Sequence, residues 1–312
     1  MPTYHESIMK NEVLRYLNIH MEGVIVDGTL GDGGHAEFIL KNTGPKTTIL
    51  GIDRDRSAIE RARERLRPFK NRVTLVHSSM ENLHELAEKS GVRKISGLLF
   101  DFGVSSPQFD TPERGFSIQN DGPLDMRMDS SQTTTAANLL QKLKDEDLVF
   151  IIKKFGEERF AKKIVRAIRK EQEEKTIKTT SHLSQIVSNA VKNRKQSRIH
   201  PATKTFQALR IAVNNELEQI KAALKNTIHL LDNSARIVAI SFHSLEDRIV
   251  KTFFREEEKD CVCPAKTPIC ICDKKQTLKI LTRRPICPSK KEIALNPRSV
   301  SAKLRVAERV YV

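Results

Sequence analysis

Three aspartates in the first part of the chain each end a short apolar run. Asp27, Asp53 and Asp101 follow the runs GVIV, TTILGI and GLLF, which are typical of buried strands. In open α/β sheets, ligands bind at the carboxyl ends of the strands. Each of the three carboxylates is therefore a candidate ligand contact, and the residues that follow it indicate which ligand it faces.

A glycine-rich loop, GTLGDGGH, follows Asp27 and leads into a helical pattern. Glycines let the backbone pass close to a ligand, and a helix N-terminus offers free N–H groups. Dinucleotides take G-x-G-x-x-G/A, which Gly31, Gly33 and Ala36 fit loosely. Enzymes that use S-adenosylmethionine place an acid before G-x-G, and Asp27 fits that pattern better. Asp53 suits the ribose hydroxyls of either cofactor, so a methyltransferase, an NAD-dependent oxidoreductase and a turn without a ligand all stay open.

The segment after Asp101 is small and polar, and it includes Ser105, Ser106 and Pro107. Amino-methyltransferases hold an exocyclic amine at this place. Such an amine is a poor nucleophile because its lone pair is delocalised into the ring. An acceptor such as Asp101, whose free pKa is about 3.9, localises the lone pair and later receives the proton. The methyl group must also lie in line between the amine nitrogen and the sulfur of the cofactor. Holding the reactants in that orientation supplies roughly 7–11 kcal/mol of the activation barrier. Two alternatives are that Asp101 contacts the methionyl end of the cofactor or caps the next loop.

Strand and helix patterns alternate over the first hundred residues. Strand-like runs at 23–28, 47–53, 72–77 and 97–101 are separated by segments with helical spacing. Such an alternation predicts an α/β fold with a parallel, doubly wound sheet.

The alternation stops near residue 107. From there to about residue 200 the sequence predicts only loops and helices, around 136–147, 145–155, 157–172 and 181–194. Sheet patterns return after a single long helix at 203–231, with a strand at 235–243, a helix at 244–259 and strands at 277–281 and 302–312. We therefore predict a sheet domain split into 1–106 and 203–312. Residues 107–202 would form a helical insertion that recognises the substrate.

The composition favours an anionic partner. The 312 residues, enough for about two domains, include 54 Lys and Arg against 39 Asp and Glu, a net charge of +15. That excess favours nucleic acid. Aromatic residues make up only 5% and tryptophan is absent, which disfavours base-stacking platforms. We expect recognition through RNA shape and phosphates, with one base drawn into the site.

Other bulk features predict a cytoplasmic enzyme without a membrane partner. No apolar run is long enough to span a bilayer, and the N-terminal sequence lacks the apolar core of a signal peptide. The five cysteines all follow residue 260, unlike a secreted disulfide framework. The sequence is compatible with a homodimer but does not fix the oligomeric state.

Several long blocks together resemble a known family. In order along the chain they are DGTLGDGGH, DFGVSSPQFD, RGFS, GPLDMRMD, RIHPATKTFQALRIAVNNEL, ISFHSLEDRIVK and NPRSVSAKLRVAER. They resemble the signature blocks of the RsmH, or MraW, family of 16S rRNA cytosine N4-methyltransferases. The resemblance implies a class I, Rossmann-like, S-adenosylmethionine-dependent fold with an inserted helical domain. It also implies methylation of the N4 amine of one decoding-centre cytidine in the small ribosomal subunit.

The resemblance also implies site residues. The family's cofactor contacts fall on Gly33, Gly34, His35, Asp53, Asp101 and Gln108. Met80 stands where members of the family often carry an aromatic residue. A methionine can still cover the face of an adenine, although the contact would differ from ring stacking.

A second candidate group, SFHSLED, ends the strand expected at 235–243. Ser241, His243 and Asp247 are candidates to line a cytidine pocket, with His243 as a catalytic candidate. Alternatively, His243 and Ser244 cap the following helix, with Ser244 as N-cap and Asp247 at the third helical position.

Candidate RNA contacts come from a loop and from basic segments. Asp125 and Arg127 either close over the target base or form a pair that holds their loop in shape. The basic segments lie at 159–170, 192–204 and near the C-terminus, and they offer phosphate contacts or solvated faces. The remaining candidates are Arg198, Arg210, Arg298 and Lys303.

Four cysteines form the pattern C-x-C-x6-C-x-C. Cys261, Cys263, Cys270 and Cys272 are candidates to hold zinc tetrahedrally. The usual spacing is C-x2-C, and the family resemblance does not require a metal, so reduced thiols in an exposed loop are the alternative.

Three further functions remain as alternatives to rRNA methylation. They are DNA amino-methylation, NAD-dependent oxidoreduction, and a non-catalytic role as an RNA-binding assembly factor. The presence of Asp27, Asp53 and Asp101 speaks against the last of these.

Overall fold

The computed structural model describes residues 7–17, 22–192, 199–264 and 270–311. The chain divides into two compact units. The first unit joins Met1–Gly103 to Leu217–Val312, and the second unit comprises Val104–Glu216. The expected helical insertion, 107–202, falls inside the second unit.

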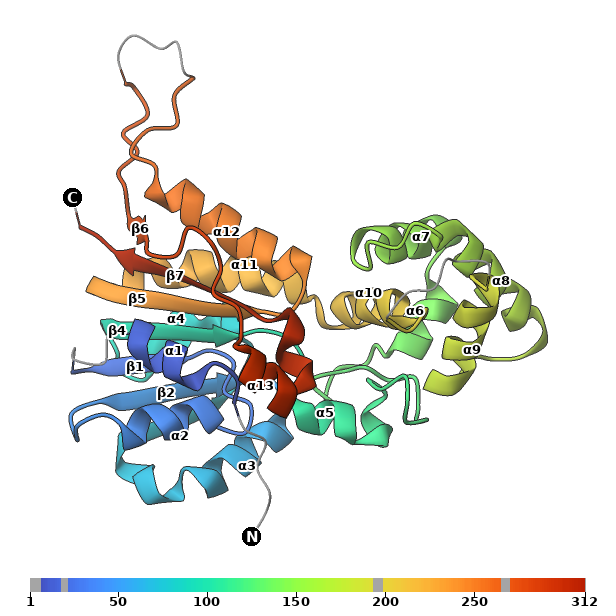
Figure 1. Cartoon of the computed structure of the whole chain (residues 1–312), viewed down its shortest axis with the longest axis horizontal. Helices are drawn as coiled ribbons and strands as arrows, with labels where there is room; N and C mark the ends of the chain where they lie inside the picture. Colours follow the sequence, from blue (N-terminus) through green and yellow to red (C-terminus); the bar gives the residue numbers. More distant parts are fainter. Residues whose placement is uncertain (1–6, 18–21, 193–198, 265–269, 312) are drawn as a thin grey trace. The chain divides into compact units, whose positions relative to one another are not determined.

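The first unit is built on a seven-stranded sheet (Figure 1). Its strands are β1 (Val24–Asp27), β2 (Thr48–Asp53), β3 (Val73–His77), β4 (Ile95–Asp101), β5 (Leu231–Ser241), β6 (Leu278–Ile280) and β7 (Lys303–Arg309). Their order is β3-β2-β1-β4-β5-β7-β6. Strands β1 to β5 pair in parallel, and β7 runs antiparallel to both β5 and β6. The predicted α/β fold with a parallel sheet is confirmed.

Helices cover both faces of this sheet (Figure 1). They are α1 (Lys10–Tyr16), α2 (Gly34–Lys41), α3 (Arg56–Arg65), α4 (Leu83–Lys89), α11 (Glu216–Thr227), α12 (Ser244–Glu258) and α13 (Lys290–Leu295). Short 3-10 turns are η1 (Arg67–Arg72), η2 (Met80–Asn82), η4 (Ile228–Leu230) and η5 (Pro297–Ser301).

Neighbouring residues of each strand enter different cores. Val26 and Leu98 pack with residues of α4, α11 and α12, whereas Ile25 and Leu99 pack with residues of α1, α2 and α3. Because side chains alternate along a strand and both faces are covered, both sets are apolar. This explains why these strands read as uninterrupted apolar runs in the sequence, and why a polar side chain at a strand end stands out.

The second unit consists, in its described residues, of helices and loops, with no strand and one isolated bridge between Pro123 and Thr179. It contains α5 (Ser106–Asp110), η3 (Pro112–Arg114), α6 (Ala136–Lys142), α7 (Asp145–Lys154), α8 (Ala161–Glu174), α9 (Thr180–Ala190) and α10 (Thr203–Asn214). It has its own hydrophobic core, formed by residues such as Leu140, Ile152 and Leu183. It can therefore be described as a separate compact body.

The prediction of one long helix at 203–231 is wrong. Helix α10 ends at Asn214, and α11 begins at Glu216. Asn215 between them is left-handed, with φ 51°, a conformation that asparagine tolerates better than most residues. The apolar spacing continues on both sides of the break, so periodicity alone did not reveal it.

No helix among the described residues is both long enough and apolar enough to cross a membrane.

Gly28, which follows β1, is expected to tolerate no side chain. A Cβ atom built on it would lie 2.4 Å from the ring of Phe100, which is fully buried and stacks on Phe102 at 5.4 Å. We expect Gly28→Ala to lower the free energy of unfolding by about 1–3 kcal/mol, since overpacking moves core atoms. Gly44→Ala is the control because nothing lies within 4 Å of its added Cβ. Urea unfolding checks both variants, and equal stability of the two would contradict the prediction.

Candidate active site

Thr29 ties the ends of β1 and β4 together. Its backbone N–H donates to Oδ1 of Asp27 at 3.2 Å, and its hydroxyl oxygen accepts from the N–H of Asp101 at 2.6 Å. The two strands are neighbours in the sheet, with Asp27 paired to Leu99. Thr29, at the start of the glycine loop, therefore fixes the positions of Asp27 and Asp101 relative to each other.

The carboxylate of Asp53 holds the glycine loop at the end of β2. Its Oδ2 accepts from the N–H of Gly31 at 2.7 Å, and its Oδ1 accepts from the N–H of Asp55 at 2.8 Å. Gly31 and Gly33 have φ of 52° and 75°, a region that glycine enters without steric cost. Burial raises the pKa of Asp53, although both N–H donors oppose the shift. Each carboxylate oxygen has a second lone pair for a ligand hydroxyl.

His35 and Asp101 leave buried polar atoms available for a ligand. His35 lies in the first turn of α2 and is only 5% exposed, and its Nε2 lies 3.5 Å from Oδ2 of Asp101. Among the described residues, both ring nitrogens of His35 and Oδ1 of Asp101 lack a hydrogen-bond partner. Buried polar atoms are rarely left unsatisfied in proteins. These atoms therefore fit a site that is completed by a bound polar molecule.

Asp27 is the most perturbed acid of this group. Burial raises its pKa to about 7, His35 and the N–H of Thr29 lower it, and the charges of Asp101 and Asp53 raise it further. Three carboxylates close enough to influence one another make the site electronegative. A cationic ligand group would favour the ionised form of Asp27.

His243 forms the N-cap of α12. Its Nδ1 accepts from the N–H of Glu246 at 3.4 Å, while Oε2 of Glu246 accepts from the N–H groups of Phe242 at 2.7 Å and His243 at 3.2 Å. Of the alternative that His243 and Ser244 cap this helix, the part for His243 is confirmed. The placement of Ser244 as N-cap with Asp247 at the third position is wrong by one residue. The fully buried Glu246 satisfies the helix terminus instead, in a capping box.

Asp247 and Ser241 are directed toward β7. Asp247 accepts from Nε of Arg305 at 2.6 Å, and Nζ of Lys303 lies 3.6 Å from it. Burial raises the pKa of Asp247, but the pairing with Arg305 and Lys303 outweighs burial and holds it below its usual value. The hydroxyl of Ser241 donates to the carbonyl of Lys303 at 3.4 Å. These contacts join α12 and β5 to the antiparallel strand.

Of the other two expected cofactor contacts, Met80 belongs to the first unit and Gln108 to the second. Met80 begins η2 in the first unit and packs half-buried against its core. In the second unit, Gln108 is buried, and its Oε1 accepts from the N–H of Ser105 at 3.1 Å at the start of α5. Ser106 is the first residue of that helix.

Two of the expected RNA-binding arginines are engaged in internal contacts. Arg127 donates twice to Asp125 at 2.7 Å and also to backbone carbonyls of its own loop. Arg210 forms a two-fold contact with Glu216 at 2.8 Å. The Asp125–Arg127 pair thus shapes its loop, which was one of the two expectations for it.

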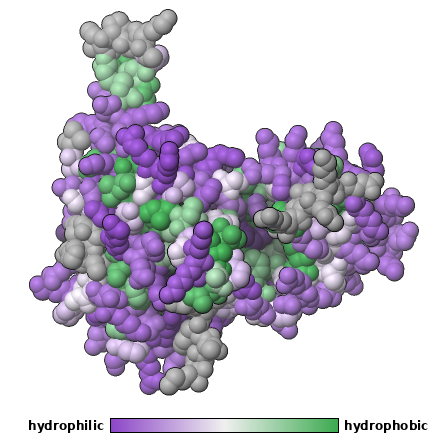
Figure 2. Space-filling view, in the orientation of Figure 1, coloured by the Kyte–Doolittle hydropathy of each residue, from purple (hydrophilic) through white to green (hydrophobic). Residues whose placement is uncertain are grey.

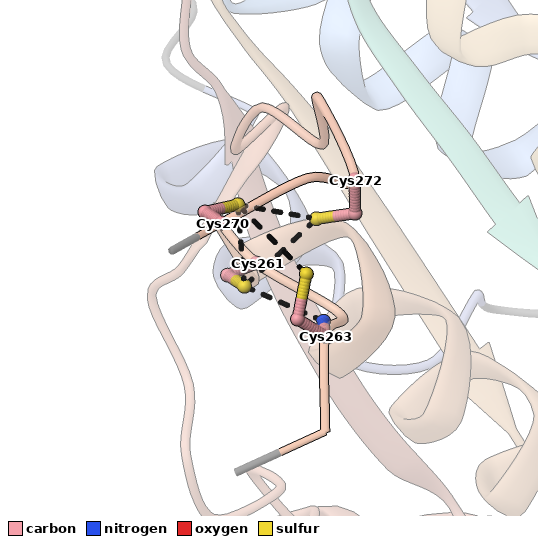
Figure 3. A group of neighbouring side chains, drawn as sticks. All are labelled: Cys261, Cys263, Cys270 and Cys272. Atoms are coloured by element: carbon pink, nitrogen blue, oxygen red, sulfur yellow. Dashed lines mark hydrogen bonds between the residues drawn. The ribbon is translucent and has the colours of Figure 1, made fainter. Parts of the chain in front are cut away.

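The remaining expected sites are the RNA contacts Arg298, Lys303 and Arg198 and the cysteine cluster. Arg298 is exposed in η5, and the side chain of Lys303 is 41% exposed. Arg198 lies outside the described residues. Cys261, Cys263, Cys270 and Cys272 come together in the loop between α12 and β6, where their sulfur atoms all lie within 4.8 Å of one another (Figure 3).

Three residues of this region were missed by reasoning from the sequence. They are Thr29, Glu246 and Arg305, which hold strand ends and a helix start in place. Glu246 follows His243 by three residues, so a capping-box search that allowed histidine at the N-cap would have found it. Arg305 left no local signal because its partner is far away in the sequence.

The strand order and the site together define the class of this protein. The class I, S-adenosylmethionine-dependent methyltransferases are characterised by six strands in one direction with an antiparallel β7 between β5 and β6, a glycine loop after β1 and an acid at the end of β2. The chain belongs to the MraW methylase family, which it matches over residues 2–310.

Curated relatives agree with this assignment over nearly their whole length. A protein of Halothermothrix orenii is 46% identical, with 98% of each chain covered, and one of Trichlorobacter lovleyi is 49% identical with the same coverage. A protein of Clostridioides difficile is 46% identical, with 99% of this chain and 100% of the relative covered. All three carry the name ribosomal RNA small subunit methyltransferase H.

The raised pKa of Asp27 predicts a pH-dependent loss of stability. Below about pH 4 its carboxyl is protonated in both the folded and the unfolded state. Between that pH and its folded pKa of about 7, only the unfolded state ionises, so folding stability falls as the pH rises. We expect Asp27→Asn to gain stability relative to the natural chain across this window, by up to about 4 kcal/mol.

The measurement is urea unfolding of the Asp27→Asn variant and the natural chain at several pH values. Asp232→Asn, at an exposed position of β5, is the control, and its stability difference should not change with pH in this way. A pH-independent difference for Asp27→Asn would contradict the prediction.

Proposed function

We propose that this methyltransferase acts on the small ribosomal subunit and methylates the exocyclic N4 amine of one decoding-centre cytidine in 16S rRNA. The observation that carries the proposal is membership of the MraW methylase family, with relatives of 46–49% identity named as small subunit rRNA methyltransferases. The net charge of +15 supports a large anionic substrate. The same proposal implies a cytoplasmic location.

S-adenosylmethionine, when bound, supplies the electrophilic methyl group on its sulfonium. The backbone of Gly31, Gly33 and Gly34 would approach it, and Asp53 would accept from the ribose hydroxyls. The buried, unpartnered atoms of His35 and Asp101 support this fit because they offer polar contacts that the described chain does not use.

The other cofactor contacts are assigned from the place of each residue in the fold. Met80, at the start of η2 after β3, would cover the adenine face. The carboxylate of Asp27 would attract the positively charged end of the cofactor. Gln108 follows from the family resemblance, and its side chain also holds the turn at Ser105.

Asp101 is the residue that we assign to the target amine. Its Oδ1 is buried without a hydrogen-bond partner in the described structure, so it can accept one N–H of the amine. Accepting that proton localises the nitrogen lone pair for attack on the methyl carbon. Ser105 and Ser106, which follow β4 closely in the chain, would hold the second N–H, and His243 would line the base pocket.

One face of α8 supports contact with RNA phosphates. Lys162, Lys163, Arg166 and Lys170 are exposed on it, while Ile164 and Ile168 are buried. Figure 2 shows hydrophilic side chains over most of the surface in view. Arg298 and Lys303 offer further basic groups in the first unit.

The test of the proposed function is methyl transfer from labelled S-adenosylmethionine to three substrates in parallel. These are unmodified small subunits, naked 16S rRNA and DNA, each digested to nucleosides for mass spectrometry. We expect N4-methylcytidine from the small subunits. Equal methylation of naked rRNA would refute the subunit as substrate, and methylated DNA would favour a DNA amino-methyltransferase. Cofactor binding without transfer to any substrate would favour an assembly factor, and binding of NAD instead of S-adenosylmethionine would favour an oxidoreductase.

Asp101→Asn is expected to slow methyl transfer under single-turnover conditions by roughly 10²–10⁴-fold, because proton acceptance is lost. Calorimetry of S-adenosylmethionine binding to the variant separates the two roles considered for Asp101. Unchanged binding with a slow reaction supports contact with the amine, whereas loss of binding supports contact with the cofactor. Asp232→Asn serves as the control, and full activity of Asp101→Asn would exclude both roles.

If the basic face of α8 contacts RNA phosphates, its replacement should weaken binding of the small subunit. Replacing Lys162, Arg166 and Lys170 by alanine should raise KM for small subunits and reduce the salt dependence of binding by about two to three counterions. The control replaces Lys46, Lys70 and Lys225, which are exposed in the first unit. Equal effects of the two triple variants would show that charge alone matters and not this helix.

A further inference from the structure

The loop between α12 and β6 has no helix or strand within its described residues, Lys259–Pro264 and Cys270–Thr277. It projects away from the sheet of its unit (Figure 1). Two apolar side chains near its tip are exposed, Val262 by 58% and Ile271 by 79%. Loops of this length without secondary structure are uncommon in compact domains. Within its described residues, the exposed Val262 and Ile271 do not anchor the two arms of the loop to a hydrophobic core. A link between the two arms would supply the missing anchor.

The four cysteines of this loop lie together, with their sulfur atoms within 4.8 Å of one another (Figure 3). The sulfur of Cys270 lies 3.6 Å from that of Cys261, 4.0 Å from that of Cys263 and 3.5 Å from that of Cys272. The sulfurs of Cys272 and Cys261 are 3.8 Å apart. Four thiolates at about 2.3 Å from a zinc ion would be separated by about 3.8 Å along each edge of a regular tetrahedron. These four separations, 3.5–4.0 Å, are close to that edge, and the other two are below 4.8 Å.

The distances do not correspond to disulfides. A disulfide needs sulfurs about 2.05 Å apart, and all four cysteines are free. Backbone N–H groups also point at two of the sulfurs, from Val262 to Cys272 at 3.3 Å and from Cys263 to Cys261 at 3.4 Å. Such N–H···S bonds stabilise thiolates that bind metals.

We propose that Cys261, Cys263, Cys270 and Cys272 bind one zinc ion in a closed structural site. Each arm of the loop contributes one C-x-C pair, so the ion joins the two arms. Four protein ligands leave no position open for water or substrate, and the site is therefore structural and separate from methyl transfer. Binding releases the thiol protons to solvent and fixes the two described arms of the loop, on which Val262 and Ile271 are exposed.

The experiment uses the full chain, purified under reducing conditions without chelators or metal-affinity resin. Elemental analysis should find about one zinc ion per chain. In the double variant Cys270→Ser, Cys272→Ser the zinc should be lost. The control Cys287→Ser changes an exposed cysteine outside the cluster and should keep its zinc. Far-UV circular dichroism checks that all three proteins are folded.

A second readout is independent of the metal present at purification. Replacing the ion by Co²⁺ should give the intense absorption of tetrahedral cobalt thiolates in the natural chain and in Cys287→Ser, and none in the double variant. The proposal fails if the natural chain contains no zinc and takes up neither Zn²⁺ nor Co²⁺. It also fails if intact mass shows that the four cysteines are paired as disulfides, or if iron occupies the site in place of zinc.

Discussion

The burial of several carboxylates at one edge of a parallel sheet is the constraint on which the rest of this structure depends. Burial favours the neutral form of Asp27 and Asp53, and in both it raises the pKa. The chain offsets this cost with backbone N–H donors from the loop after β1, at Thr29 and Gly31. Gly31, whose N–H reaches Asp53, is itself left-handed, a conformation that glycine adopts without steric cost. The glycine loop is thus a support for the acids as well as a surface for a ligand.

The same arrangement connects stability with ligand binding. An electronegative site that is costly in the empty protein becomes favourable when a cation enters it, and the proposed cofactor carries both a sulfonium and an ammonium group. Because Asp27 has a pKa of about 7, a bound cation would shift its protonation near neutral pH. Binding and proton release should then be linked, and the cofactor should stabilise the first unit by mass action.

The fold was largely predictable from the sequence, whereas the contacts that hold the site were only partly so. Strands buried on both faces give continuous apolar runs, and an acid at the end of such a run marks the functional edge. The break at Asn215 left no such signal, since it changes one backbone conformation while the apolar spacing continues. The N-cap falls on His243 and not on Ser244, because Glu246 at the third helical position closes the capping box. A capping-box pattern restricted to Ser or Thr at the N-cap does not find this arrangement.

Net charge likewise indicates a type of partner without identifying the residues that bind it. A net charge of +15 indicates an anionic partner, but it does not tell which cations are available to that partner. Arg72 donates to the carbonyls of Thr47, Leu40 and Gly44, and Arg210 is held by Glu216. The guanidinium group, with five donors in a rigid fork, is well suited to such internal bracing. Phosphate contacts are therefore better sought among lysines and arginines that stand opposite a buried face, as on α8, than among the arginines of the most recognisable sequence blocks.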